Sequence, residues 1–405
     1  MKRYLKRLRE LKAKDWLAPM IFPFAYIVAK LFYRKQKDLI LIGESRAEAR
    51  DNGYWLFRYI REKVPEQRVA YVIDFDSPDY DKVRDLGECI PYGSFKHWVY
   101  YLSCGVIAVS QKECRPNTAF FYFLEVAGFL KNKRVFLQHG ITISDAKWLY
   151  YDQTKFSGFI CGAKPEYDAI LNDFGYPDSS VRYLGFPRFD QLHETKVNPR
   201  QILLMPSWRS WLVNKTDARY EFNEGDDFTA SEYFIKWNAF LSDPTLKEFL
   251  EKNDLQLIFY PHRNMQVHLN EFTKTSDHIQ MASWKEHDIQ DLLKSSAFMI
   301  TDYSSVFMDF AYMKKPMLFY QFDQGKFRKG QYAKGYFDYE KDGFGPVIKE
   351  GAKQVVAYLE KSFANDFQLE EAYLAKIDRY FPLYDQNNSQ RVYDFLKELL
   401  DECAQ

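Results

Sequence analysis

Residues 301–310, with the sequence TDYSSVFMDF, place two acids and several hydroxyl groups between an apolar run and a helical pattern. Residues 296–300 resemble a strand, and the apolar residues from 306 onward recur at helical spacing. The polar side chains therefore lie near the start of a predicted helix, where free backbone N–H groups and the helix dipole attract an anion. Ser304 or Ser305 could equally cap this helix. Two interpretations stay open from this segment alone, namely phosphate binding and helix capping.

Polar residues follow other predicted strands in the same way. His139 and Gly140 come after an apolar run, and glycine allows backbone to approach a ligand closely. Arg209 follows residues 201–206, and the pair His262 and Arg263 follows residues 255–261. A single histidine at such a position is more often structural. Several such groups at strand ends indicate a ligand site instead, with these candidates: His139, Gly140, Arg209, His262, Arg263, Thr301, Asp302, Ser304, Ser305 and Asp309.

These residue types suit the transfer of a phosphorylated group. A histidine can take the proton of an attacking alcohol, and further cationic groups or helix N-terminal amides can offset charge on phosphate oxygens. No Walker A sequence and no GxGxxG motif occurs, which argues against an ordinary ATPase or dehydrogenase. Asp74-Phe75-Asp76 resembles a metal-binding DxD pair but precedes the turn signal of residues 77–79. The sequence therefore requires no metal and no cofactor.

The elements that must hold these residues alternate between strand and helix. From residue 37 onward the pattern predicts a strand at 38–43, a helix at 44–62 and further strands, and the cycle restarts after residue 200. Such alternation is typical of parallel sheets covered on both faces. We expect an α/β protein of two doubly wound, Rossmann-like domains that face a cleft. Residues 212–230 are polar and predict a long loop.

The predicted domains follow from length and composition. A chain of 405 residues with 46% hydrophobic content is long enough for two packed domains. We expect four parts, namely a membrane-associating segment, an acceptor domain, a donor domain and C-terminal helices that could cross back to the first domain: residues 1–36, 37–192, 193–375 and 376–405. The five cysteines have no metal-ligand spacing and suit free thiols in a reducing compartment, so we expect a cytoplasmic location.

The N-terminal segment is basic, although the whole chain carries 56 basic and 56 acidic residues. Residues 1–38 hold eleven Lys or Arg and three acids, next to a run rich in Trp, Phe, Ile and Tyr. This pattern favours a peripheral site on an anionic membrane over a solvated helix pair. The long apolar run argues against a nucleic-acid-binding arm. At residues 16–29 it is too short to cross a bilayer, which takes about 20 apolar residues.

Taken in order, the motifs resemble the CDP-glycerol glycerophosphotransferases, bacterial enzymes of teichoic acid and capsular polysaccharide synthesis. The resemblance rests on motifs spread over roughly residues 38–385: Gln138-His139-Gly140, Pro206-Ser207-Trp208-Arg209, Tyr260-Pro261-His262, and residues 301–305 with Asp309, Pro316 and Asp323. Residues 185–190 are similar to the link between the family's two domains. One position departs from the pattern, because family members commonly carry Lys where this chain has Tyr260. Arg263 is the neighbouring candidate for that charge.

The resemblance implies a GT-B-like fold at the inner membrane face and transfer of glycerol phosphate from CDP-glycerol with release of CMP. It implies that His139 is the general base for the acceptor hydroxyl, and that His262, Ser304, Ser305 and Asp309 lie on the donor side. The acceptor would be a lipid-linked saccharide, a teichoic chain or a capsular glycan. Three alternatives remain: a CDP-ribitol-dependent transferase, a GT-B glycosyltransferase with a nucleotide-sugar donor, and a membrane scaffold without activity.

Overall fold

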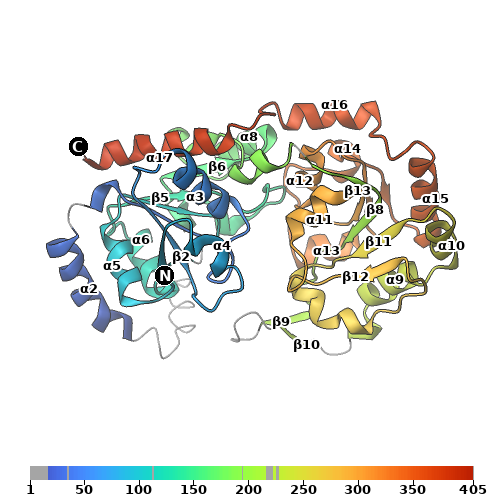
Figure 1. Ribbon diagram of the computed structural model, residues 1–405, viewed down its shortest axis with the longest axis horizontal. Coiled ribbons are helices and arrows are strands. Elements are labelled where there is room, and N and C mark those ends of the chain that lie inside the picture. Colours follow the sequence, from blue (N-terminus) through green and yellow to red (C-terminus); the bar gives the residue numbers. More distant parts are fainter. Residues whose placement is uncertain are drawn as a thin grey trace. The chain divides into compact units, whose positions relative to one another are not determined.

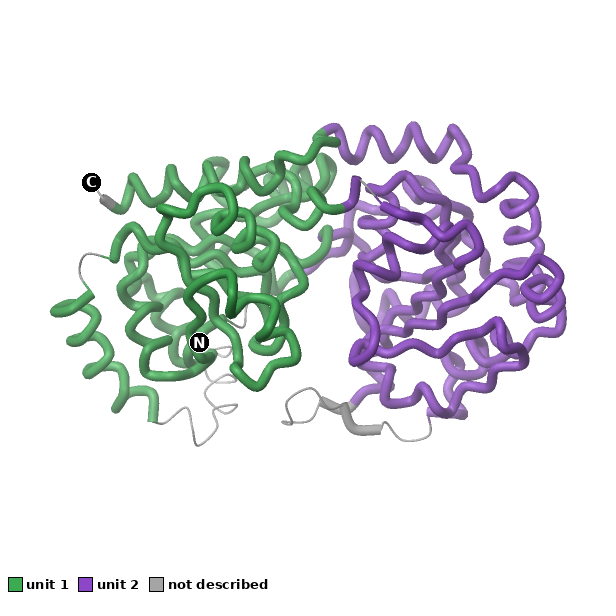
Figure 2. Tube along the Cα trace, viewed as in Figure 1, with its two compact units in different colours: residues 1–141, 147–191, 383–405 green, residues 142–146, 192–382 purple. Residues whose placement is uncertain are grey.

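The structure, a computed structural model, describes residues 17–33, 36–111, 114–193, 195–215, 222–224 and 228–404. The chain forms two compact units (Figure 2). Unit 1 contains residues 1–141, 147–191 and 383–405, and unit 2 contains residues 142–146 and 192–382. Residues 142–146 thus leave the first unit shortly after His139, and the C-terminal helix α17 (Asn388–Ala404) returns to it.

Unit 1 is built around a seven-stranded parallel sheet in the order β3-β2-β1-β4-β5-β6-β7. Helices cover both faces of this sheet (Figure 1). The strands are β1 (Ile40–Gly43), β2 (Val69–Ile73), β3 (Glu88–Pro91), β4 (Val106–Val109), β5 (Lys133–Phe136), β6 (Gly158–Cys161) and β7 (Val181–Tyr183). Its helices are α2 (Ala18–Phe32), α3 (Asn52–Lys63), α4 (Tyr80–Arg84), α5 (Phe95–Ser103), α6 (Thr118–Val126), α7 (Tyr151–Thr154), α8 (Lys164–Asp173) and α17, with the short 3-10 helices η2 (Gln36–Asp38), η3 (Lys147–Leu149), η4 (Asp178–Ser180) and η5 (Pro187–Gln191).

Unit 2 contains a six-stranded parallel sheet in the order β12-β11-β8-β13-β14-β15. Its strands are β8 (Asn198–Met205), β11 (Gln256–Phe259), β12 (Ile279–Met281), β13 (Ser296–Thr301), β14 (Met317–Tyr320) and β15 (Val347–Ile348). Its helices are α9 (Glu232–Leu241), α10 (Pro244–Lys252), α11 (Ile289–Ser295), α12 (Phe307–Tyr312), α13 (Gln324–Gly330), α14 (Tyr339–Asp342), α15 (Ala352–Phe363) and α16 (Glu371–Tyr380), with η6 (Phe228–Ala230) and η7 (Arg263–Glu271). The predicted class, an α/β protein of two doubly wound sheets, is confirmed.

Each sheet has a point at which the strand order reverses direction. In unit 1 this switch point lies between β1 and β4, and in unit 2 it lies between β8 and β13. Doubly wound sheets bind ligands beyond the carboxyl ends of the strands at this point. The fold therefore predicts ligand sites at the loops after β1 and β4 in unit 1 and after β8 and β13 in unit 2.

Two expectations about elements were wrong. The helix predicted from residue 44 begins at Asn52, because Asp51 caps it by accepting a hydrogen bond from the Asn52 amide. Residues 44–51 instead form the loop after β1. Residues 212–230 were predicted as a loop, yet their described parts include an antiparallel pair of short strands, β9 (Val213–Lys215) and β10 (Phe222–Glu224).

The basic segment of residues 1–16 lies outside the described residues, whereas the aromatic run that follows it forms α2. Helix α2 packs against α5 through small residues, and Ala18, Ala25 and Ala29 are buried. Its other side exposes bulky apolar side chains: Leu17, Met20, Phe24, Ile27 and Leu31. Of the helices that the structure describes, not one has the length and hydropathy of a membrane span.

Candidate active site

The loop after β13 is tied to the loop after β8 by a buried ion-pair network. Asp302 accepts from the Ser207 amide at 2.8 Å and pairs with the Arg209 guanidinium at 2.9 Å. Arg209 also pairs with Asp323 at 2.7 Å, and its remaining donors reach the Ser207 carbonyl and hydroxyl. Thr301 donates to the Met205 carbonyl at 2.7 Å. This buried network holds together the loops after β8 and β13 at the switch point of unit 2.

Burial distinguishes two groups among the predicted donor-site residues. The side chains of Arg209, Thr301 and Asp302 have no exposed part, and Asp309 on α12 is 4% exposed. An arginine whose fork is filled by two carboxylates holds a site in shape and has little left to offer a phosphate. Ser304 and Ser305 are half-buried instead. Direct phosphate contact therefore stays a prediction that suits the two serines better than Arg209.

The sequence left open that Ser304 or Ser305 caps the following helix. In the structure, neither side chain caps α12. The N-cap residue of α12 is Val306, and it makes no side-chain capping bond. The first turn is closed instead by the Ser304 and Ser305 carbonyls, which accept from the amides of Phe307 and Met308. Among the described residues, neither serine hydroxyl has a hydrogen-bond partner. Both hydroxyls remain available to a ligand.

His262 follows β11 and stands at the start of η7. Its Nδ1 accepts a hydrogen bond from the Asn264 amide at 3.2 Å, so the ring proton of the neutral form lies on Nε2. Burial, with Arg263 as a second cause, lowers the pKa of His262 to about 4. The ring stacks on Trp208 with 6.0 Å between centroids, and the Arg263 guanidinium lies over Trp284 at 3.8 Å. Near neutral pH His262 is thus an uncharged donor.

His139 lies in the loop after β5 in unit 1, and its side chain is exposed. Its Nδ1 lies 3.2 Å from the carbonyl oxygen of Ser110, the residue after β4. A carbonyl can only accept, so Nδ1 carries the proton and Nε2 is the unprotonated, accepting nitrogen. That tautomer is the one a general base needs. The positive φ in this loop belongs to Gln138, at 62°, directly before His139 and Gly140.

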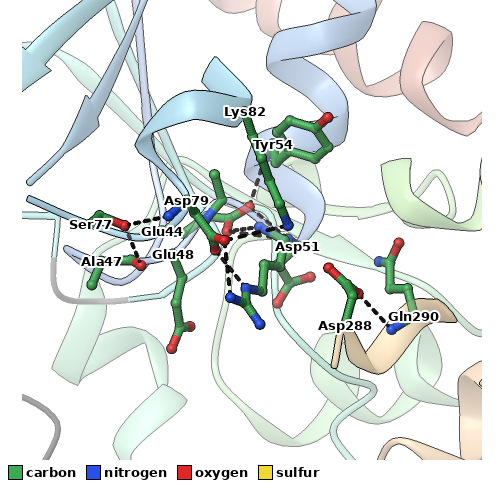
Figure 3. Close-up of polar contacts among 12 residues, drawn as sticks. Glu44, Ala47, Glu48, Asp51, Tyr54, Ser77, Asp79, Lys82, Asp288 and Gln290 are labelled. Atoms are coloured by element: carbon green, nitrogen blue, oxygen red, sulfur yellow. Dashed lines mark hydrogen bonds and ion pairs between the residues drawn. The ribbon is translucent and has the colours of Figure 1, made fainter. Parts of the chain in front are cut away.

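Glu44 and Asn52 were not among the predicted site residues, because residues 44–62 were predicted as one helix. Glu44 is 2% exposed and accepts from the backbone amides of Arg50, Asp51 and Tyr54 (Figure 3). Burial, followed by the charge of Asp51, raises the pKa of Glu44 to about 8. Asn52 is fully buried and bonds to the backbone of the His139 loop. The run Asp51-Asn52-Gly53 is a typical cap and turn signal that could have located this helix start.

The acidic residues beside this loop are engaged in ion pairs. Asp79 pairs with Arg50 at 2.6 Å and accepts from the Ala49 amide (Figure 3). Asp74, the first acid of the Asp74-Phe75-Asp76 run, pairs with Arg46 at 2.6 Å. Within the described ranges, no group of three or more His, Cys, Asp or Glu side chains could hold a metal ion.

Comparison with known proteins shows the family to which the chain belongs. A family model described as CDP-glycerol:poly(glycerophosphate) glycerophosphotransferase matches residues 24–398. The minor teichoic acid biosynthesis protein GgaB of Bacillus subtilis (strain 168) is 33% identical over 92% of this chain and 41% of its own length. A teichoic acid glycerol-phosphate transferase of Staphylococcus aureus is 26% identical over 55% of each chain. The chain thus spans about two fifths to one half of these relatives.

Solved structures agree on the fold. The wall teichoic acid polymerase TagF superimposes with a TM-score of 0.68 at 14% identity, over 99% of this chain and 98% of that one. A second similar structure, Staphylococcus aureus MnaA with UDP, has a TM-score of 0.56 at 14% identity, over 90% and 96% of the two chains. At such identity these likenesses establish the fold alone.

Proposed function

Because this chain belongs to the CDP-glycerol:poly(glycerophosphate) glycerophosphotransferase family, we propose that it transfers glycerol phosphate from CDP-glycerol to a hydroxyl of a teichoic or capsular glycan and releases CMP. Family membership confirms the resemblance inferred from the motifs. The observation that carries the proposed activity is the tautomer of His139, whose Nδ1 is held by the Ser110 carbonyl. In this tautomer Nε2 carries no proton, so it can accept one from an attacking hydroxyl.

The proposed reaction is a displacement at phosphorus. The acceptor oxygen bonds to the phosphorus that carries glycerol, and its proton passes to His139 Nε2. The bond from that phosphorus to the bridging oxygen breaks, and CMP leaves with the electron pair. Ser304 and Ser305 hydroxyls and the Nε2–H of His262 donate to the phosphate oxygens, while the network of Arg209, Asp302 and Asp323 keeps their loops in place.

The donor assay tests this proposal directly. Purified protein is incubated with a glycerol-phosphate-primed acceptor and either CDP-glycerol, CDP-ribitol or a UDP-sugar, and CMP and UDP are measured. We expect CMP from CDP-glycerol, and a loss of at least about 100-fold in His139→Asn, which keeps a donor for the Ser110 carbonyl but has no base. CDP-ribitol is included because relatives named as ribitol-phosphate transferases also match. UDP release, or full activity of His139→Asn, would reject the proposal.

We also infer that the protein binds the cytoplasmic face of the cell membrane peripherally. The support is the exposed side of α2, where Leu17, Met20, Phe24, Ile27 and Leu31 are between 52% and 69% exposed. Their spacing of three and four residues places them on one face of the helix. An apolar face on a helix that follows a basic segment in the sequence suits insertion at the boundary between headgroups and acyl chains.

A further inference from the structure

A single buried side chain, that of Asn52, holds the backbone that leads into His139. Its Nδ2 donates to the Leu137 carbonyl at 3.1 Å and to the Gln138 carbonyl at 2.7 Å. Its Oδ1 accepts from the Arg188 amide at 3.2 Å. The side chain is 0% exposed, so water cannot replace these bonds. Asn52 therefore fixes two consecutive peptide groups directly before His139.

The backbone conformation of Gln138 requires support from neighbouring residues. Gln138 has φ of 62°, a left-handed conformation that is unfavourable for a residue with a side chain. Such a conformation persists only where its surroundings impose it. The bond from Asn52 to the Gln138 carbonyl supplies this constraint on the residue itself. It sets the direction in which the chain leaves β5 and hence the place of the His139 ring.

Asn52 is itself fixed by the first turn of α3. The Glu44 carboxyl oxygens accept hydrogen bonds from the amides of Arg50, Asp51 and Tyr54 at 2.7–3.0 Å (Figure 3). A Cβ on Gly53 would lie 2.9 Å from Glu44 Cγ, so glycine lets the carboxylate lie against the helix. The Gly53 amide donates to the Ser110 hydroxyl at 2.8 Å, and the Ser110 carbonyl holds the His139 ring. Ser110 thus contacts both the start of α3 and the His139 ring.

A different role for this helix start is disfavoured by the same contacts. The first helix N-terminus of a doubly wound domain is where a ligand phosphate often lies. Here the carboxyl group of Glu44 already accepts from those amides. The start of α3 is therefore built to hold protein backbone in place.

We propose that Asn52 is the positioning residue for His139, acting through the carbonyls of Leu137 and Gln138. The proposal rests on the proposed function of His139 as a base. Loss of the two donors would let Gln138 relax and would move Nε2 away from the acceptor hydroxyl. A displacement of about 1 Å at a reacting group can reduce turnover by about 100-fold.

The test compares Asn52→Ala and Asn52→Asp with Asn132→Ala. The aspartate has nearly the same volume and can accept from Arg188, but it cannot donate to the two carbonyls. Asn132 donates to the Tyr101 carbonyl at 2.6 Å and lies at the other end of β5, so its variant loses a similar bond away from His139. We expect both Asn52 variants to lose at least about tenfold in kcat for CMP release with an unchanged Kd for CDP-glycerol, and Asn132→Ala to keep its kcat.

A double-mutant cycle separates positioning from general damage. In the His139→Asn background, Asn52→Ala should cause no further loss, because its effect passes through His139. If Asn52→Ala fails to fold, it is combined with Gln138→Gly, because glycine adopts the left-handed backbone conformation without strain. The kcat of the double variant is then compared with that of Gln138→Gly alone. Wild-type kcat in the Asn52 variants, or additive losses in the cycle, would overturn the positioning role. Failure of wild type to release CMP would instead reject the proposed function.

Discussion

The two candidate histidines, one in each unit, hold their ring protons on different nitrogens, and hydrogen bonds to backbone groups determine which nitrogen is protonated. His139 donates from Nδ1 to the Ser110 carbonyl, so Nε2 is the nitrogen without a proton. His262 accepts at Nδ1 from the Asn264 amide, which leaves Nε2–H as a donor. In the proposed reaction, one residue type would thus supply a base from one unit and a neutral donor from the other. The family resemblance implied these two roles, whereas the ring tautomers follow from backbone contacts that only the folded chain shows.

His262 allows its capping and donor functions to be separated. His262→Asn keeps an acceptor near the Nδ1 position for the Asn264 amide but lacks a group at Nε2. His262→Gln places an amide donor near Nε2 and loses the cap, which is worth about 0.5–2 kcal/mol. We expect His262→Asn to keep the thermal stability and lose at least about tenfold in kcat/KM for CDP-glycerol. His262→Gln should melt earlier and keep more activity. The reverse ranking would contradict a donor role for His262.

The pKa of His262 also predicts how stability depends on pH. The unfolded chain binds a proton on this ring near its ordinary pKa of 6.5, whereas the folded protein binds it only near 4. As the pH falls from 6.5 to 4, the unfolded state gains protons first, so stability is lost through this window and levels off below it. Melting temperatures at pH 7 and pH 5 check this. His262→Asn should lose less stability between these pH values than wild type.

At the scale of elements, the sequence predicted the central strands of both sheets and missed the edge strands. Every residue of β1 and β2 is buried, and both strands are apolar runs that face helices on both sides. β3 and β7 in unit 1 and β12 and β15 in unit 2 are the edge strands. They mix buried with partly buried or exposed residues, as in β3 (Glu88–Pro91) and β7 (Val181–Tyr183). Local sequence carries little signal for such strands, because pairing with a neighbour creates them.

The difference between local sequence signals and contacts formed on folding also explains which site residues could be predicted from the sequence. His139, His262 and the residues of 301–305 follow strands that a run of apolar residues reveals. Asn52 and Glu44 act through contacts with residues more than fifty positions away or through the turn that ends β1. Only the folded chain brings these partners together.

Residues 142–146 form an element that connects the His139 loop to unit 2. Ser144 pairs with Lys334 in an antiparallel bridge, and a Cβ on Gly335 would lie 2.6 Å from the backbone of Ile143 and Ser144. Gly335→Ala should therefore displace this segment and, through Gly140 and Ile141, His139. We expect kcat for CMP release to fall about 10- to 100-fold while the Kd for CDP-glycerol stays unchanged.

A matched glycine gives the control for this prediction. A Cβ on Gly325 in α13 would meet no atom within 4 Å, so Gly325→Ala should keep the wild-type kcat. Equal kcat in the Gly335 and Gly325 variants would show that residues 142–146 do not determine the place of His139.

At the scale of the whole molecule, charge is balanced but unevenly distributed, and the basic N-terminal segment precedes α2 in the sequence. A deletion that includes α2 would expose α5 to solvent, because α2 packs against α5 and its Ala18, Ala25 and Ala29 are buried. Point substitutions on the exposed face are therefore the sharper test of membrane binding. They change what a bilayer would contact and leave the buried alanines in place.

The combined variant Met20→Ser, Phe24→Ser and Ile27→Ser should weaken binding to vesicles that contain phosphatidylglycerol by at least about tenfold, since each apolar side chain contributes about 1.5–3 kcal/mol when it is fully buried. Co-sedimentation with the vesicles measures this binding. Ile235 on α9 is 53% exposed, so Ile235→Ser controls for the loss of a surface apolar group in unit 2 and should sediment like wild type. CMP release with a water-soluble acceptor should stay unchanged in both variants, because the substituted residues lie outside the site. Undiminished sedimentation of the α2 variant would show that this face does not bind the membrane.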